Sequence, residues 1–135
     1  MADYSAIRTA IATRLSTSAT FIQVSSTAPD TISPPCAIVL PGSPVVEYHQ
    51  AFGNGLERYV FTILVLMQRF DAAAQQDLVD GLMSGAGSIR ALIEGDLTLD
   101  GSAETCQVLS ATSYGAVEFN ETTYLGCEWT LEVYA

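Results

Sequence analysis

The feature of the sequence that most constrains the fold is a run of nine residues, Tyr59 to Met67, in which only Thr62 is polar. A transmembrane helix needs about 20 apolar residues, whereas this run has less than half that length and is flanked by Arg58 and Arg69. Its Val, Ile, Phe and Tyr content favours a β-strand over a helix. Because successive side chains of a strand point to opposite faces, both faces of this strand are apolar and both need a cover.

Two segments predict helices that cover one of these faces. Residues 3–16 predict an N-terminal helix, because apolar side chains recur there every four residues behind a capping aspartate. Residues 71–83 predict a central helix with Asp71 as its N-cap, and a short helix is predicted to follow over residues 89–96. The core-facing residues of the central helix are predicted to be Leu78, Val79, Leu82 and Met83.

The remaining segments predict strands. Short strands are predicted over residues 21–24 and 36–42, the second of them stopped by Pro41-Gly42. Residues 44–59 predict a long projecting hairpin that turns through Gly53-Asn54-Gly55 and returns along the apolar run. Residues 105–119 predict either two short strands or one strand bent at Gly115. The last segment alternates cleanly, with these residues predicted to face the core: Leu125, Cys127, Trp129, Leu131 and Val133.

Together these elements predict one α+β domain over residues 1–135. Its sheet is antiparallel or mixed, and the N-terminal and central helices pack on one face. A chain of this length is long enough for a hydrophobic core and too short for two domains.

The charge of the chain excludes several functions. The chain has fifteen aspartate and glutamate residues, five arginines and no lysine, which gives a net charge of −10. Binding to phosphates or to an anionic membrane surface depends on cations, so the composition argues against a nucleic-acid or membrane-surface protein. The N-terminal sequence lacks the basic and apolar regions of a secretory signal, so we expect a cytosolic protein. The three cysteines, Cys36, Cys106 and Cys127, are expected to be buried and reduced.

No set of residues predicts catalysis, a metal site or a cofactor. The single histidine, His49, has no exposed thiol to activate, because the cysteines lie in apolar strands. Residues 96–107 imitate a calcium loop, but Thr98 and Gln107 replace two of the carboxylates that such a loop needs, and a tight Asp-Gly turn explains the same residues. A row of glutamates near the C-terminus is expected to be a solvated face. We therefore expect a protein that is not an enzyme.

The order of the segments resembles the tail-terminator proteins of long, non-contractile-tailed phages, particularly those that infect actinobacteria. The segments that carry the resemblance are the N-terminal helix, PPCAIVLPG (34–42), the hairpin into YVFTILVLMQRF (59–70), the helix followed by GAGSIRALIEGDLTLDG (85–101), and YLGCEWTLEVYA (124–135). They span most of the chain, although each motif is structural. A neighbouring neck or head–tail joining protein of similar fold is the alternative. A cytosolic small-molecule binding domain is a third possibility, which the scarcity of convergent polar groups disfavours.

The resemblance implies a virion structural protein at the tail–neck junction, assembled in the host cytoplasm. It would form a homohexameric ring that binds the last ring of tail-tube subunits, ends their polymerisation and meets the head-side connector. DNA would pass through the lumen without specific binding, and an acidic wall would repel its phosphates. Acidity is also common in soluble proteins of other kinds.

The resemblance also suggests which residues form interfaces. Neighbouring copies are expected to cover the second face of the apolar strand, which makes Tyr59 and Phe61 candidates. The projecting hairpin offers exposed anchors, although its aromatic residues have an alternative in packing on their own subunit. The hairpin candidates are Glu47, Tyr48, His49, Gln50 and Phe52. The outward row of the last strand, Glu128, Glu132 and Tyr134, is expected to line a subunit boundary or the lumen.

Overall fold

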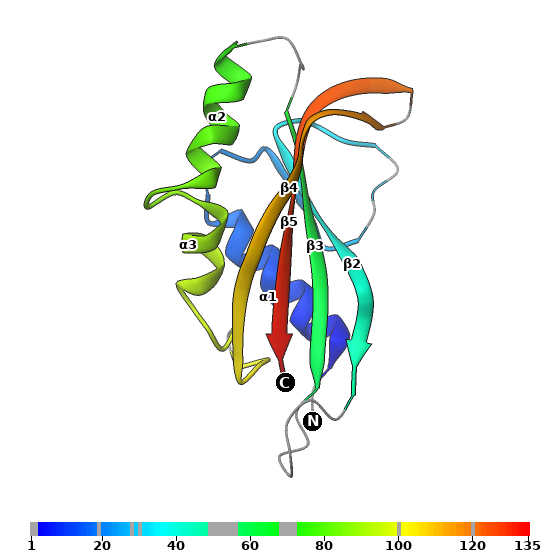
Figure 1. Cartoon of the computed structure of the whole chain (residues 1–135), viewed down its shortest axis with the longest axis vertical. Coiled ribbons are helices and arrows are strands. Elements are labelled where there is room, and N and C mark those ends of the chain that lie inside the picture. The colour runs from blue at the N-terminus through cyan, green and yellow to red at the C-terminus, as the bar shows by residue number, and fades with distance from the viewer. Residues whose placement is uncertain are drawn as a thin grey trace.

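The computed structural model of the chain has three helices on one side of a five-stranded sheet within its described residues (Figure 1). The described residues are 3–18, 20–27, 29, 31–48, 57–67, 73–99, 101–119 and 121–135, without the side chains of 74 and 75. The elements are α1 (Tyr4–Ser16), β1 (Gln23–Ser25), β2 (Cys36–Glu47), β3 (Arg58–Met67), α2 (Ala73–Met83), α3 (Ile89–Glu94), β4 (Thr105–Phe119) and β5 (Thr122–Tyr134). The predicted α+β class is confirmed.

The sheet has the strand order β1-β2-β3-β5-β4 and is mixed. β1 runs parallel to β2, and all other neighbours are antiparallel. The apolar run is the central strand β3, which pairs with β5 along its whole length, from Arg58 opposite Tyr134 to Met67 opposite Leu125. The prediction of a strand with two apolar faces is confirmed, because alternate residues of β3 are buried in two apolar clusters on opposite faces of the sheet.

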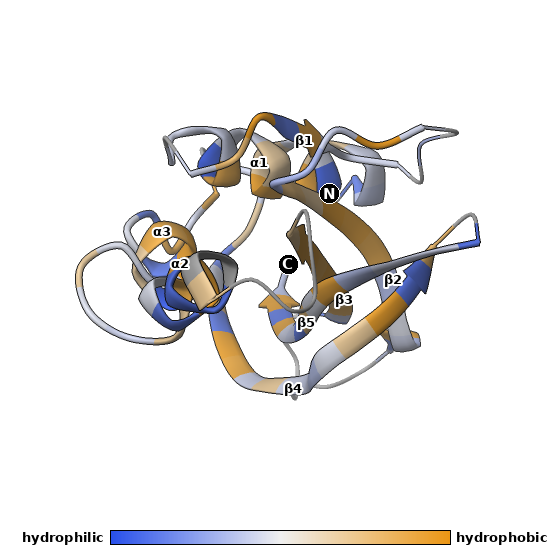
Figure 2. Ribbon diagram, turned by 90° about the horizontal axis from the view of Figure 1, so that it is seen from above, coloured by the Kyte–Doolittle hydropathy of each residue, from blue (hydrophilic) through white to orange (hydrophobic). Residues whose placement is uncertain are grey.

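The helices lie on the inner side of the curled sheet (Figure 2). Asp3 caps α1 by accepting hydrogen bonds from the backbone N–H groups of Ser5 and Ala6, as predicted for its start. Tyr4 then stacks on Phe61 of β3, with ring centroids 4.9 Å apart. Near the other end of α1, Arg14 donates from Nε to the carbonyl oxygen of Leu92 at 2.9 Å, which ties α1 to α3.

The central helix packs as predicted except at one residue. Val79 and Leu82 of α2 are buried, and Met83 packs against the core. Leu78 is 38% exposed, which contradicts its prediction as a core residue. Positions 82, 79 and 83 form the buried stripe of the helix, and position 78 lies at the edge of that stripe, about 40° beyond position 82. The predicted N-cap, Asp71, lies outside the described residues.

The second face of β3 is covered by the chain itself. Val60, Leu64 and Leu66 are 3%, 8% and 0% exposed in the single chain. Leu64 and Leu66 form a second apolar cluster with residues of β2, separated by the sheet from the main core beneath the helices. The side chains that pack over this second cluster are Ile32, Leu40, Val117, Phe119 and Tyr124. The expectation that a neighbouring copy must cover this face is therefore wrong.

Much of this cover comes from the hairpin of β4 and β5. Their pairing continues to Phe119 opposite Thr122, whereas the pairing of β5 with β3 ends at Leu125. The end of the hairpin bends across the upper ends of β3 and β2 on the side opposite the helices (Figures 1 and 2). β4 is one strand with register shifts between Val108 and Ser110 and between Thr112 and Gly115, so the predicted bend at Gly115 is confirmed.

β2 runs further than predicted. It continues through Pro41 to Glu47, with an irregularity between Pro41 and Val46, so the predicted stop at Pro41-Gly42 is wrong. A proline is tolerated because β1 pairs only with Cys36–Ile38 and leaves this part of the outer edge without a strand partner among the described residues. Gly42 lies directly over Val60, and a Cβ at Gly42 would approach the Val60 backbone to 2.8 Å. The tip of the predicted β2–β3 hairpin lies outside the described residues.

Replacing Leu66 with alanine tests whether the monomer seals this second face. Leu66 is fully buried in the single chain, so Leu66→Ala should lower the free energy of unfolding by about 2–5 kcal/mol. Urea unfolding at a concentration where the chain is monomeric measures the change. Leu97→Ala, at a leucine that is 47% exposed, is the matched control and should change it by less than about 0.5 kcal/mol. A small effect of Leu66→Ala would mean that the face is sealed only by a partner.

Candidate functional site

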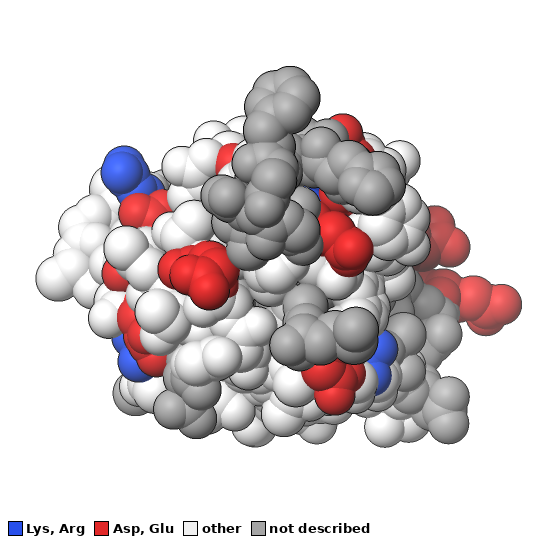
Figure 3. Space-filling view, turned by 90° about the horizontal axis from the view of Figure 1, so that it is seen from below, with Lys and Arg blue, Asp and Glu red and all other residues white. Residues whose placement is uncertain are grey.

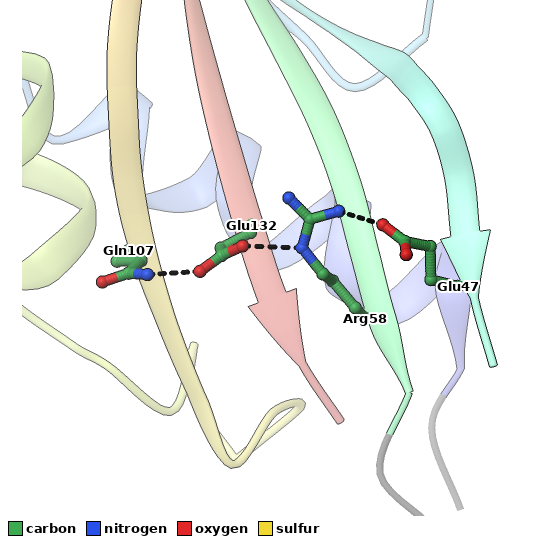
Figure 4. A network of polar contacts seen from close by, with 4 residues as sticks. All are labelled: Glu47, Arg58, Gln107 and Glu132. Carbon is green, nitrogen blue, oxygen red and sulfur yellow. Dashed lines mark hydrogen bonds and ion pairs between the residues drawn. The ribbon is translucent and has the colours of Figure 1, made fainter. Parts of the chain in front are cut away.

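The most extensive polar arrangement among the described residues crosses four strands on the second face of the sheet (Figure 4). We call it the polar ladder, formed by Glu47 of β2, Arg58 of β3, Glu132 of β5 and Gln107 of β4. Arg58 donates from Nε to Glu132 Oε2 at 2.6 Å and from a terminal nitrogen to Glu47. Gln107 donates its amide N–H to the other oxygen of Glu132. Both carboxylate oxygens of Glu132 are therefore engaged.

The centre of the ladder is largely removed from water, whereas Glu47 and Gln107 at its two ends are more exposed. The side chains of Arg58 and Glu132 are 20% and 8% exposed. The hydrogen bond to Glu132 is the main reason that the pKa of Arg58 is raised above its ordinary value, with Glu47 adding to the effect and burial opposing it. A guanidinium held between two carboxylates has no role in proton transfer, because it stays protonated at any physiological pH. The ladder is therefore a structural tie that fixes the register of four strands at this end of the sheet.

The predicted interface residues differ widely in exposure. Tyr48 is 64% exposed at the end of β2, and Glu47 beside it belongs to the polar ladder. His49, Gln50 and Phe52 lie outside the described residues, so their roles stay predictions. The outward row of β5 is only partly open, because Glu128 and Tyr134 are both half-buried.

Three of the predicted interface residues are buried in the single chain. Phe61 is 0% exposed and Tyr59 is 7% exposed, and both belong to the main core beneath α1. Glu132 is 6% exposed and both its oxygens are bonded, so it does not line an open surface. These placements correct the prediction, because a residue within its own core has no surface to offer a partner. The alternation of β5 predicted the correct face for Glu132, but not its partners Arg58 and Gln107 on the neighbouring strands.

The three thiols are buried and reduced, as predicted. Burial raises the pKa of each of them, Cys36, Cys106 and Cys127, to about 11. A thiol at such a pKa carries almost no thiolate at neutral pH and is a poor nucleophile. Tyr59 is shifted as well, because burial and its hydrogen bond to Glu57 raise its pKa to about 12.

The remaining polar clusters serve the fold. Asp96, in the segment that imitates a calcium loop, accepts hydrogen bonds from the backbone and hydroxyl of Thr98. Across the part of the chain that the structure describes, no group of three or more histidine, cysteine, aspartate or glutamate residues is arranged to hold a metal. An open hollow of about 490 Å³ lies at the junction of α2 and α3. Three of its polar lining residues make contacts of their own: Ser88 caps α3, and Arg90 pairs with Glu94.

Two contacts between helices and β4 were not predicted from the sequence. Glu94 of α3 accepts the backbone N–H of Val108 at 3.0 Å, where the first irregularity of β4 interrupts the ladder. Tyr114, at the second irregularity, donates its hydroxyl to Asp80 of α2 at 2.9 Å. The run from Thr105 to Val117 has no charged residue, which is unusual for an edge strand. This pattern does not indicate that helices contact the strand.

Comparison with known proteins leaves the family open. Neither the protein-family models nor the curated proteins include a match to this chain. None of the helices within the described residues has the length and apolar content that a membrane crossing requires. The argument about function therefore depends on the residues themselves.

Removing Arg58 tests whether the polar ladder is a structural tie. Arg58→Met should destabilise the chain by about 3 kcal/mol, because it leaves the buried carboxylate of Glu132 without its cation. Arg90→Met is the matched control, since Arg90 is 75% exposed and pairs with Glu94 at 3.3 Å, and it should change stability by less than about 0.5 kcal/mol. Urea unfolding at neutral pH compares them, and equal effects would contradict the tie.

The buried thiols predict a loss of stability in alkaline solution. Each has a pKa raised from 9.0 to about 11 in the folded chain, so its proton is held more tightly there than in the unfolded chain. This contribution is complete below about pH 9 and is lost between about pH 9 and pH 11. The free energy of unfolding should be level from neutral pH to about pH 8 and fall by several kcal/mol by about pH 11. Cys106→Ala should make the fall shallower, and an unchanged slope would contradict the assignment.

Proposed function

We propose that this chain is the subunit of a structural ring that closes the tail tube of a long-tailed phage and joins it to the head-side connector. The observation that carries the proposal is the order of its elements, which follows the resemblance to tail terminators: an N-terminal helix, β2 and β3, the helix pair α2 and α3, and the final hairpin of β4 and β5. This role requires a rigid subunit with docking surfaces and no catalytic centre.

The use of the polar groups supports an architectural role. The guanidinium of Arg58, the carboxylate of Glu132 and the carboxylate of Glu94 are all bonded to other strands or helices. The thiols are buried at a pKa of about 11. An active site usually brings perturbed titratable groups together in a cleft. In the described residues, the strongly engaged groups instead join elements of the fold.

The sealed second face changes how assembly proceeds under this proposal. Leu64 and Leu66 are covered by the chain's own hairpin, so a copy folds completely before it meets another copy. Docking then depends on exposed apolar side chains, and two of these lie at the end of β2. Tyr48 is 64% exposed there and Val45 is 43% exposed. An exposed tyrosine such as Tyr48 is typical of an interface anchor.

The distribution of charge supports a lumen that conducts DNA. Glu57 and Glu104 lie at the end of the sheet where β5 finishes, because their backbones pair with Ala135 and Tyr134. Seen from below, this end shows acidic side chains in several places and few arginines (Figure 3). In a ring of such copies, carboxylates turned toward the channel repel the phosphates of the genome, which slides without binding.

Assembly with the tail tube tests the proposal. We expect the purified chain, mixed with the tail-tube protein of the same phage, to form a closed ring at the tube tip and to stop further tube growth. Native mass spectrometry gives the ring mass in multiples of 14.4 kDa, and negative-stain imaging locates the ring. A chain that stays monomeric and leaves tube growth unchanged would overturn the proposal. Binding to the head-side connector without binding to the tube would instead favour a neighbouring neck protein.

Tyr48→Ala identifies the docking surface in the same assay. Tyr48 is exposed in the single chain, so its removal should leave monomer stability within about 0.5 kcal/mol of the parent. If Tyr48 anchors the assembly, the affinity should fall by about tenfold or more. Leu97→Ala removes a comparably exposed apolar side chain from another part of the surface and should assemble normally.

A further inference from the structure

The end of the β4–β5 hairpin is a two-stranded arm that extends beyond the rest of the sheet. We define the arm as residues 117–119 and 121–124, which pair only with each other because β3 pairs with β5 no further than Leu125. Two strands without a third are marginally stable on their own, so the arm depends on the surface on which it lies. That surface, which we call the seat, is formed by Cys36, Ile38, Leu64 and Leu66.

The seat and the arm make a small apolar unit that is separate from the main core. Val117, Phe119 and Tyr124 of the arm pack against the seat, and each is only partly buried. The four seat residues are buried at 8% exposure or less and lie on the face of β2 and β3 that points away from the helices. On the opposite side of the arm, Glu118 and Thr123 are exposed. The arm is therefore amphipathic, with an apolar face on the seat and a polar face exposed to solvent.

The base of the arm has the features of a hinge. Gly115 and Gly126 lie directly opposite each other in the register of β4 and β5, so no pair of side chains crosses the bend. The register shift between Thr112 and Gly115 comes immediately before it. A Cβ at Gly126 would lie 2.7 Å from Val117 Cγ2 and 3.1 Å from Leu66 Cδ2, so only glycine lets the arm fold this closely onto the sheet. Bulges and facing glycines are devices that permit a sharp bend in a hairpin.

We propose that in the assembled state the arm of one copy leaves its own seat and occupies the seat of the neighbouring copy. This inference rests on the proposed ring, and it names the contact that joins its subunits. The occupant is defined by the structure, because the chain's own arm already fits the seat. Exchange of an identical element makes the same contacts between copies as within one copy, and it therefore needs only a high local concentration, such as copies gathered on a tube tip.

A second copy is also the occupant that the charge allows. A chain of net charge −10 repels its copies, and the repulsion is smallest where the contact carries no charge. The seat and the arm residues that face it are uncharged. The acidic residues of the arm, Glu118 and Glu121, are exposed and stay in water in either arrangement. In the isolated copy the closed arm acts as a cap that prevents premature assembly.

Photo-cross-linking with two isotopic forms of the chain tests the exchange. Phe119 is replaced by p-benzoylphenylalanine, which keeps an aromatic ring in the arm. Equal amounts of heavy and light chains are assembled on the tail tube, irradiated and analysed by mass spectrometry. In the monomer fraction we expect links from position 119 to the seat of the same chain. In the assembled fraction we expect links to the seat of another chain, about half of them joining heavy to light by random mixing.

The same replacement at Tyr114 is the matched control. Tyr114 is an aromatic residue of β4 outside the arm, and it contacts Asp80 and Gln76 of α2. It should link within one chain in both fractions. A replacement at Tyr124, on the other strand of the arm, repeats the test if the variant at Phe119 folds poorly.

The outcomes distinguish failure of the arm exchange from failure of the proposed ring. An assembly in which position 119 and position 124 link only within one chain overturns the exchange and leaves the proposed ring intact. A chain that forms no assembly with the tube overturns the ring and the exchange together. Links between chains at Tyr114 as often as at Phe119 would show non-specific contact and would also overturn the exchange.

Discussion

The burial of β3 on both faces is the constraint on which the rest of the structure depends. A strand with one polar residue among nine needs a cover on both faces, and β3 lies in the middle of the sheet. Three helices supply one cover, in which Tyr4 stacks on Phe61 and α2 contributes Val79. The second cover is divided. At one end the β4–β5 hairpin folds back over Leu66, and at the other end the polar ladder surrounds Arg58. The face of the sheet that points away from the helices thus changes from apolar at one end to polar at the other.

This division explains how an acidic chain keeps a buried carboxylate. Glu132 lies at the polar end, where Arg58 neutralises it and Gln107 completes its hydrogen bonds. A buried charge is tolerated when it is paired and fully bonded, and it then makes the register specific. Shifting β5 by one residue would place Glu132 among the apolar side chains of the main core. The polar ladder therefore acts against misregistered pairing of the same strands.

The sequence predicted the elements whose signals are local, and it missed the contacts between distant segments. The two-faced apolar run, the cap at Asp3 and the alternation of β5 are local patterns, and all three are present in the structure. Arg58 and Glu132 are 74 residues apart, so no local pattern indicates that they meet. The cover over Leu66 comes from a few apolar residues on two strands, which is too weak a periodicity to predict a docking surface. Pro41 led to the wrong prediction of a strand end. Proline interrupts a strand that is paired on both sides, but it is tolerated where one edge of the strand has no partner.

The two irregularities of β4 have a further consequence for solubility. Residues 105–117 carry no charge and no proline, and they lie at an edge of the sheet, where an unpaired strand can add strands from other molecules and start a fibril. The backbone N–H of Val108 is occupied by Glu94, and Tyr114 is held by Asp80. The two register shifts interrupt the regular pairing of this strand, and such irregularities disfavour the addition of strands at an edge. These contacts from α2 and α3 hinder the pairing of β4 with strands of other molecules, which its uncharged composition would otherwise favour.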